Sequence, residues 1–328
     1  MHCPTLAELP PPPPGKTGWP WTEESSTFPA DQPDGAPWPK IGIVTPSFNQ
    51  ADYLEQSIRS VLLQGYPNLD YVIIDGGSTD QSVAVIRKYE RWITFWVSER
   101  DQGCSDACAK GFTHTNGDLL GVMNGDDFFA PDAFAKLLTL RQTHPDHVFW
   151  GGTSVELDLA GNQIKAKQPY VRDQNAVGNW GVGMWCFGVG ILFDGPAYRD
   201  VGGFDPRFRV ACDVELWIRL AKKGKFTFTS ETTAFVHHNP QSVSRINEMR
   251  NDMELVAANF LHGHPDIARI KMIRYFKIWL QSLKANPSPE PDSAEAILSL
   301  APPGILVRAL LRRLASNVKQ GLRGLFRR

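Results

Sequence analysis

The sequence predicts an α/β protein with a mostly parallel sheet covered by helices on both faces. Between residue 40 and about residue 238, short apolar runs alternate with segments whose apolar residues recur at helical spacing. The apolar runs stop at polar turns, several of which contain glycine. Continuous apolar runs that alternate with helices are typical of strands in a parallel sheet. With 328 residues, 42% of them hydrophobic and 21% charged, the chain is long enough to bury a full core.

The first two strand–helix units span residues 41–89. Residues 41–44 and 71–74 are the apolar runs, and apolar residues at helical spacing follow each of them, at 53–62 and at 83–89. The first turn offers hydroxyls and backbone amides to a nucleotide, and the second offers a carboxylate that can accept from a base or ribose. The residues of these turns are Thr45, Pro46 and Ser47 in the first, and Asp75, Gly76 and Gly77 in the second.

The next two units lead to a pair of adjacent carboxylates. We expect strands at 93–97 and 119–123 and a short helix at 105–112. Asn-Gly-Asp-Asp at 124–127 follows the last strand, and Pro131 opens a further helix. Ligands of open α/β sheets bind outside the carboxyl ends of the strands, and carboxylates there suit Mg²⁺ or Mn²⁺ on a diphosphate. Asn-Gly and Asp-Asp are also ordinary turn chemistry, so a turn without a metal is the alternative.

The pattern changes in the second half of the domain. Residues 155–165 are expected to form a hairpin, and a helix begins near Asp213 and ends at 222–224. Residues 180–193 are rich in Gly, Trp and Phe, and we interpret them either as the floor of an acceptor site or as core packing.

Two extensions flank the expected domain of 40–245. Residues 1–39 contain the proline run 10–14, which favours polyproline II and excludes a helix. A disordered or surface-wrapping segment is favoured over a proline-rich ligand for a partner, and the aromatic residues would pin it to the domain surface. These aromatic residues are Trp19, Trp21, Phe28 and Trp38.

Residues 246–328 are helical in composition, with a proline-rich break at 287–291. The last piece, 305–328, carries seven basic and no acidic residues, and its apolar residues follow one helical stripe. Such a helix can lie on an anionic membrane surface, although packing on its own domain or on a second subunit is the alternative.

Composition excludes several classes of function. A formal net charge of -1 gives no electrostatic case for nucleic acid as a partner. The five cysteines lack zinc-ligand spacing and are expected to be free thiols in a reducing compartment. No segment approaches the ~18 consecutive apolar residues of a membrane span, and the pattern of a signal peptide is missing. We therefore expect a cytoplasmic protein, peripheral on the inner face of the membrane if 305–328 contacts lipid.

Residues 41–127 resemble the nucleotide-binding half of the family 2 glycosyltransferases, which have the GT-A fold, and the resemblance continues into the second half. Together the matching motifs cover about 40–245 in order, with 40–127 as the nucleotide-binding half and 128–245 as the acceptor half. The motifs lie at 43–49, 73–80, 98–103, 105–107, 110–112, 116–118, 124–127, 201–205 and 213–220.

The resemblance implies an inverting transfer from a nucleoside-diphosphate sugar to a glycan or lipid-linked acceptor in polysaccharide biosynthesis. UDP-sugar is the favoured donor, with GDP- and dTDP-sugars open, and Mn²⁺ or Mg²⁺ is the implied cofactor. Asp213 occupies the position of the general base. Asp126 is the implied metal ligand, with Asp127 beside it and His238 closing over the phosphates, while His237 leaves that assignment open by one residue. The implied nucleotide-binding residues are Thr45, Pro46, Ser47, Asn49, Asp75 near the base, Gly77, Ser78, Asp101, Lys110 and Asn124.

The chemistry agrees with these residue types. Displacement at an anomeric carbon needs a base for the acceptor proton and positive charge on the departing diphosphate. The alternative role of Asp213 is to cap the helix that follows it. Glycoside hydrolysis also uses paired carboxylates, but it has no need of the nucleotide turns.

Three positions depart from the family pattern. Gly76 stands where many members have a second Asp, Cys104 replaces a frequent Gln or Ile, and Ala109 replaces a frequent Asn that would touch the donor. A non-catalytic member that binds sugar nucleotide or glycan is therefore one alternative. A nucleotidyltransferase is the other, although no basic, glycine-rich triphosphate loop follows the first strand.

Overall fold

The computed structural model describes residues 3–158, 160–179, 182–238 and 248–268. The chain divides into two compact units, 1–246 and 247–328, and the sheet belongs to the first. The described part of the second unit contains helix α8 (Glu248–Leu261). Residues 269–328, which include the basic stripe at 305–328, lie outside the described residues. None of the helices in the described ranges combines the length and hydrophobicity needed to span a membrane.

Four parallel strands form the first half of the sheet. Their order is β3-β2-β1-β4. In the register, Ser47 at the end of β1 pairs with Asp75 at the end of β2, and Asp75 pairs with Ser98 at the end of β3. The carboxyl ends of these three strands are therefore level, which gathers their turns at one edge of the sheet. The bounds are β1 (Ile41–Ser47), β2 (Leu69–Asp75), β3 (Phe95–Ser98) and β4 (Leu119–Val122).

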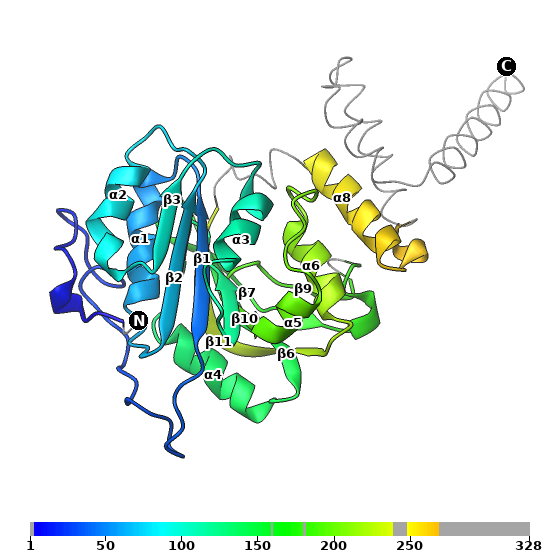
Figure 1. Cartoon of the computed structure of the whole chain (residues 1–328), viewed down its shortest axis with the longest axis horizontal. Helices are drawn as coiled ribbons and strands as arrows, with labels where there is room; N and C mark the ends of the chain where they lie inside the picture. Colours follow the sequence, from blue (N-terminus) through cyan, green and yellow to red (C-terminus); the bar gives the residue numbers. More distant parts are fainter. Residues whose placement is uncertain (1–2, 159, 180–181, 239–247, 269–328) are drawn as a thin grey trace, which may run out of the picture. The chain divides into compact units, whose positions relative to one another are not determined.

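Helices cover both faces of these strands, with α1 and α2 on one side and α3 on the other (Figure 1). Side chains alternate along each strand, so Ile43 and Ile73 belong to the core under α1, whereas Val44 and Ile74 face α3. Gly111 lets α3 approach closely, because a Cβ there would lie 3.1 Å from one Val44 methyl and 3.2 Å from Ile74 Cγ1. The helices are α1 (Ala51–Leu62), α2 (Ser82–Tyr89) and α3 (Cys104–Phe112), with the 3-10 turn η2 (Glu90–Trp92) after α2.

The second half extends the same sheet with mixed strand directions. The order continues β4-β10-β6-β11-β5, where β6 and β11 are parallel, and β7 pairs antiparallel with β6. A separate two-stranded sheet joins β8 and β9. The strands are β5 (Asp127–Phe129), β6 (His147–Leu157), β7 (Gln163–Lys167), β8 (Tyr170–Val171), β9 (Met184–Trp185), β10 (Ile191–Asp194) and β11 (Lys225–His237). The helical elements are α4 (Ala133–Thr143), η3 (Gln174–Ala176), α5 (Gly195–Asp200) and α6 (Cys212–Leu220).

This architecture confirms the predicted α/β fold, and element boundaries account for the differences. The strand expected at 93–97 begins two residues later, at Phe95. The residues up to Trp92 form the 3-10 turn η2, and the chain becomes extended only after it. The helix expected to open at Pro131 begins at Ala133, after Asp132 turns the chain with a φ of 58°. The helix expected to reach 222–224 ends at Leu220, and turns carry the chain on to β11.

Residues 3–39 pack against the domain, as the surface-wrapping interpretation expects. Cys3, Leu9 and Trp38 are buried in the same core cluster as Ile41. Arg59 of α1 holds the segment: its side chain is fully buried and donates to backbone carbonyls of the segment at 2.8–3.0 Å. The acceptors are the carbonyls of Pro10, Pro20 and Trp21.

Candidate active site

The turn after β2 is built around the buried carboxylate of Asp75. Its Oδ1 accepts from Ser78 Oγ at 2.5 Å, and its Oδ2 accepts from Ser78 N at 2.9 Å and from Ser98 Oγ at 2.6 Å. Asp75 is fully buried, so these donors replace water around its charge. The structure therefore places Asp75 as the organiser of the turn, with both oxygens occupied by protein donors.

The predicted nucleotide-binding residues at the end of β1 differ in how far their side chains are exposed to solvent. Thr45 is fully buried, and its hydroxyl contacts the Tyr71 hydroxyl at 3.1 Å. Ser47 Oγ is buried and has no hydrogen-bond partner among the described residues. Asn49 is exposed, with a φ of 51°, and its Oδ1 accepts from Thr79 N at 2.9 Å.

Backbone contacts join this strand end to its neighbours. Gly76 N donates to Ser47 O at 2.8 Å, and Gly125 N donates to Pro46 O at 3.3 Å. The turns after β1, β2 and β4 are thus held together by the main chain, and their side chains gather at one sheet edge, as predicted.

Asp101 lies against the turn after β2. A Cβ built on Gly76 would lie 2.8 Å from Asp101 Oδ2, so the two segments touch. Gly77 has a φ of 81°, a backbone conformation that disfavours a side chain. Burial raises the pKa of Asp101, although the Gly103 N–H donates to its Oδ1 at 2.8 Å. Lys110, in the last turn of α3, pairs with Glu99.

The Asn-Gly-Asp-Asp turn lies between β4 and β5. Asn124 Nδ2 donates to Asp127 Oδ2 at 3.0 Å, and the backbone N–H of His237 donates to Asp127 Oδ1 at 3.2 Å. Burial and the adjacent charge of Asp126 hold the pKa of Asp127 well above its usual range. Burial also raises the pKa of Asp126, while the Gln50 side chain hydrogen-bonds it.

His237 is the histidine beside this turn. Its Nδ1 lies 2.6 Å from the carbonyl oxygen of Asp126, so Nδ1–H donates and Nε2 is left as an acceptor. The ring also packs against Tyr53 and Phe128, with centroids 4.9 and 5.6 Å away. His238 follows β11, and its backbone N–H donates to Leu157 O at 2.7 Å.

These residues fit a hard divalent cation that is shared with a substrate. Within the described ranges, no group of three or more His, Cys, Asp or Glu side chains is arranged as a complete metal site. Mg²⁺ and related ions are commonly held by one or two carboxylates, with waters and substrate phosphates completing the shell. Asp126, His237, whose Nδ1 is held by the Asp126 carbonyl, and the Ser47 hydroxyl, which has no partner among the described residues, are the candidates for such a partial set.

Asp213 lies in the first turn of α6. Its Oδ1 accepts from Val214 N at 2.7 Å, and its Oδ2 faces Gly188, where a Cβ would lie 3.2 Å away. The side chain is half-buried. The N-terminus of a helix stabilises negative charge, so the first turn of α6 is a favourable place for a carboxylate.

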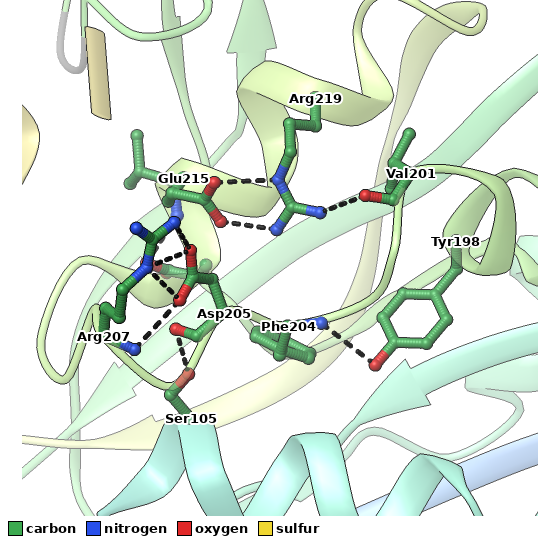
Figure 2. Close-up of polar contacts among 10 residues, drawn as sticks. Ser105, Tyr198, Val201, Phe204, Asp205, Arg207, Glu215 and Arg219 are labelled. Atoms are coloured by element: carbon green, nitrogen blue, oxygen red, sulfur yellow. Dashed lines mark hydrogen bonds and ion pairs between the residues drawn. The ribbon is translucent and has the colours of Figure 1, made fainter. Parts of the chain in front are cut away.

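A network of ion pairs holds this end of α6 in place (Figure 2). The buried Glu215 carboxylate pairs twice with Arg219, at 2.8 and 2.5 Å, and Arg219 also donates to Val201 O at 2.9 Å. Ser105 Oγ, at the start of α3, donates to Asp205 O at 2.9 Å, which ties the two halves of the domain together. Glu215 is thus a buried support of this helix.

Three cysteines lie together where α3 and α6 begin. Cys104 and Cys108 have sulfurs 4.0 Å apart, and Cys212 at the start of α6 hydrogen-bonds Cys104. The hydrogen bond with Cys104 and burial hold the pKa of Cys108 well above its usual range, and the charges of Asp213 and Asp101 contribute. All five cysteines are free, as predicted.

An aromatic pair directly precedes Gly188, the glycine that faces Asp213. Trp185 and Phe187 are half-buried, with ring centroids 4.9 Å apart, and the Lys167 ammonium lies over both rings at 5.2 and 5.4 Å. Phe187 immediately precedes Gly188, which faces the Asp213 carboxylate. The expected aromatic stretch therefore contributes partly exposed rings close to the candidate base.

Sequence reasoning missed two residues of this site. Gln50 carries no motif, and its contact with Asp126 depends on the approach of Gly125, whose Cβ would meet the Gln50 amide. His237 was weighed only as the neighbour of His238, and the pairing of Val236 with Asp127 between β11 and β5 determines which of the two reaches the turn.

The comparisons agree with this geometry. The model of the family described as "Glycosyl transferase family 2" matches residues 42–193. An uncharacterized glycosyltransferase of Mycobacterium tuberculosis is 30% identical over 186 residues, 56% of this chain and 69% of the relative. One from Haemophilus influenzae is 34% identical over 136 residues, 39% of this chain and 52% of the relative.

Solved structures show the same fold at low identity. The crystal structure of S. aureus TarS 1–349 in complex with UDP-GlcNAc has a TM-score of 0.59 at 11% identity, and covers 80% of this chain and 79% of that one. The mannosyltransferase PcManGT from Pyrobaculum calidifontis, in complex with GDP-Man and Mn²⁺, has a TM-score of 0.52 at 16% identity and covers 87% of each chain. Since the sheet, the strand-end turns, the matching family model and the relatives agree, this chain belongs to glycosyl transferase family 2 and is a glycosyltransferase with the GT-A fold.

Proposed function

We propose that the protein transfers a sugar from a nucleoside-diphosphate sugar to a hydroxyl of a glycan or lipid-linked acceptor, with inversion at the anomeric carbon. The observation that supports the proposal is that the turns carrying Asp101 and Asp126 are joined at one edge of the sheet, and that Ser105 at the start of α3 ties this edge to the loop before α6, which carries Asp213. A nucleotide-sugar reaction needs these three groups together: one for the nucleotide, one for the diphosphate end and one for the acceptor proton.

In the proposed reaction, the acceptor oxygen attacks the anomeric carbon from the face opposite the diphosphate. The new C–O bond forms as the bond to the diphosphate oxygen breaks, and the diphosphate leaves with that electron pair. Asp213 Oδ2 takes the acceptor proton, while Val214 N–H holds Oδ1 in place. Glu215 and Arg219 keep the first turn of α6, and so the base, in position.

The proposed metal position is the turn at Asp126. Asp126 would hold Mn²⁺ or Mg²⁺ together with Nε2 of His237, which the Asp126 carbonyl orients through Nδ1. When bound, the ion supplies positive charge that stabilises the departing diphosphate. Asp127 would support the turn, because its oxygens are bonded to Asn124 and His237 N. The proposal uses His237 in place of His238.

UDP-sugar is the proposed donor, and the partly exposed rings of Trp185 and Phe187 are the proposed acceptor surface. One structural neighbour is in complex with UDP-GlcNAc and another with GDP-Man and Mn²⁺. Because these two donors carry different nucleotides, the binding of UDP and GDP to this protein has to be compared directly. Flat aromatic faces beside the base suit the apolar face of an acceptor sugar.

Asp213→Asn separates catalysis from binding. We expect the variant to bind UDP with Mn²⁺ as the wild type does, and to lose roughly 10²- to 10⁴-fold in turnover, because the amide cannot take the acceptor proton. The measurements are UDP binding by calorimetry and UDP release from a panel of UDP-, GDP- and dTDP-sugars, with and without a chelator.

If Asp213→Asn turned over as fast as the wild type, the proposed role of Asp213 as the general base would be contradicted. Activity that survives complete removal of divalent ions would contradict the proposed metal. A wild-type protein that binds none of these nucleotides would refute the donor site as a whole.

A further inference from the structure

Three thiols lie together where the two halves of the domain are joined. Cys104 is the first residue of α3, and Cys212 is the first residue of α6. The Cys104 sulfur lies 4.0 Å from that of Cys108, and Cys212 hydrogen-bonds it from the other helix. The Ser105 hydroxyl donates to Asp205 O at 2.9 Å and so holds the start of α3 against the loop before α6 (Figure 2). The proposed reaction uses none of these thiols.

Cys104 combines exposure with activation. The structure describes all five cysteines, and Cys104 is partly exposed whereas the other four are buried. The first turn of a helix stabilises negative charge, which favours the thiolate of Cys104. Hydrogen bonds from Cys108 and Cys212 also hold the pKa of Cys104 well below its usual range. A peroxide that reaches this place therefore meets Cys104 in the form that reacts with oxidants.

Helix geometry decides which neighbour can bond to Cys104. Residues four apart on a helix have Cβ atoms about 5–6 Å apart, whereas a disulfide needs about 3.5–4.5 Å. A bond from Cys104 to Cys108 would therefore distort the first turn of α3. Cys212 lies on another helix, so its sulfur can approach by a shift of one segment. Gly103 has a φ of 114°, and none of the described residues beyond its chain neighbours lies within 4 Å of a Cβ built there, which leaves room for that shift.

From these observations we infer that Cys104 and Cys212 form a reversible disulfide, which links α3 to α6 and switches sugar transfer off. In the first step the Cys104 thiolate attacks an oxygen of hydrogen peroxide: the S–O bond forms, the O–O bond breaks, and hydroxide leaves with that electron pair. The Cys212 sulfur then attacks the sulfenic acid, so that the S–S bond forms, the S–O bond breaks, and water leaves with the Cys212 proton. Two thiols are oxidised, the peroxide is reduced to water, and a dithiol reductant reverses the change.

The disulfide would act on the candidate base through its chain neighbour. Cys212 directly precedes Asp213, whose Oδ1 accepts from Val214 N at 2.7 Å. Bond formation shortens the contact between the two sulfurs from hydrogen-bond distance to about 2.05 Å, and the first turn of α6 moves with its sulfur. A catalytic group misplaced by about 1 Å can cost on the order of 10²-fold in rate. The disulfide itself does not require the proposed function, and only its effect through Asp213 rests on it.

The test oxidises the full chain with a small molar excess of hydrogen peroxide, blocks the remaining thiols and digests the protein with trypsin without reductant. Cys104 lies on the tryptic peptide 101–110, and Cys212 lies on 210–219. We expect these two peptides to be joined, and the free thiols to fall by two from the five of the reduced chain. Nucleotide release from the donor sugar should fall about tenfold to a hundredfold, and dithiothreitol should restore it.

Serine variants identify the two sulfurs. Cys104→Ser and Cys212→Ser should each prevent joining and keep their own nucleotide release after peroxide, compared with the same variant before treatment. In Cys212→Ser the sulfenic acid of Cys104 persists, so dimedone should label peptide 101–110. The matched control is Cys108→Ser, the same change on the same peptide, which should still give the joined peptides and the loss of turnover.

Several results would overturn the inference. A bond within peptide 101–110 alone, or joined peptides in Cys104→Ser, would refute the inferred pairing. Joined peptides with unchanged nucleotide release would refute the effect on transfer. If the reduced wild type releases no nucleotide from any donor sugar, the proposed function fails and the effect on transfer fails with it, whereas the joined peptides still decide whether the disulfide forms.

Discussion

Gly125 and Gly188 each lie against a polar side chain of the candidate active site. A Cβ at Gly125 would lie 3.3 Å from Ser47 Oγ, and one at Gly188 would lie 3.2 Å from Asp213 Oδ2. Neither glycine has a positive φ, so the backbone does not require them. These glycines leave room for the side chains of Ser47 and Asp213. A motif search for charged residues does not detect glycines of this kind.

Gly188→Ala is expected to slow turnover with little change in donor binding. The added methyl group would push the Asp213 carboxylate by a few tenths of an ångström, and general-base catalysis is sensitive to such shifts. We expect kcat to fall by about tenfold, measured from initial rates at saturating donor. The control is the affinity for UDP, which should stay at the wild-type value, and an unchanged kcat would show that Asp213 tolerates the displacement.

At the same scale, the sequence predicted which turns gather at one edge of the sheet but not the orientation of every side chain. Asp126 and Asp127 were recognisable because two adjacent carboxylates follow an apolar run. The choice between His237 and His238 depends on the register of β11 against β5, and a shift of one residue exchanges the two faces of a strand. That register is set by contacts between positions more than 100 residues apart, which local patterns do not encode.

Helix α1 packs against two different parts of the protein, the sheet and the N-terminal segment 3–39. Its apolar positions pack on the sheet, as the spacing predicted, while Arg59 turns a fully buried guanidinium toward residues 3–39. A charged residue in an amphipathic helix is normally assigned to the exposed face. Arg59 departs from that rule because its partners are carbonyls 38 to 49 positions earlier in the chain.

Arg59→Met should destabilise the protein by about 2–5 kcal/mol in urea unfolding. The methionine keeps the apolar stem but leaves the buried carbonyls of Pro10, Pro20 and Trp21 without donors. Arg87→Met is the matched control, because Arg87 is exposed on α2, and it should change the free energy of unfolding by less than about 0.5 kcal/mol. Equal stabilities of the two variants would show that the carbonyls find other donors.

At the scale of the whole molecule, residues 3–39 complete the core of the first unit. Phe28, Trp38 and Tyr66 form an edge-to-face group with centroids 5.0 to 6.1 Å apart, and Trp19 Nε1 donates to Phe129 O at 2.7 Å. The composition of this segment indicated an extension, and its aromatic residues indicated an anchor. The sequence did not predict which surface these aromatic residues cover. Proline-rich segments have no helix or strand periodicity from which the residues that share one face could be identified.

Because the thiol of Cys3 is buried, the free energy of unfolding of this unit is expected to fall as the pH becomes alkaline. Burial raises the pKa of Cys3 to about 12, so the unfolded chain releases this proton at lower pH than the native protein does. Its contribution to stability is complete below about pH 8.5 and is lost progressively as the pH rises toward 12. Between pH 8 and pH 10.5 the wild type should therefore lose about 2–3 kcal/mol more than Cys3→Ala, measured by urea unfolding at each pH. Parallel losses in the two proteins would show that the thiol ionises without unfolding.

The bond between Trp19 and Phe129 also has a consequence for synthesis of the chain. Its two residues are 110 positions apart, so the ribosome needs roughly 5–20 s to make the acceptor after it has made the donor. Throughout that interval Trp19 lacks the acceptor that its indole N–H will bond in the folded protein. The nascent protein therefore presents an aromatic, proline-rich segment to chaperones before it presents any part of a nucleotide site.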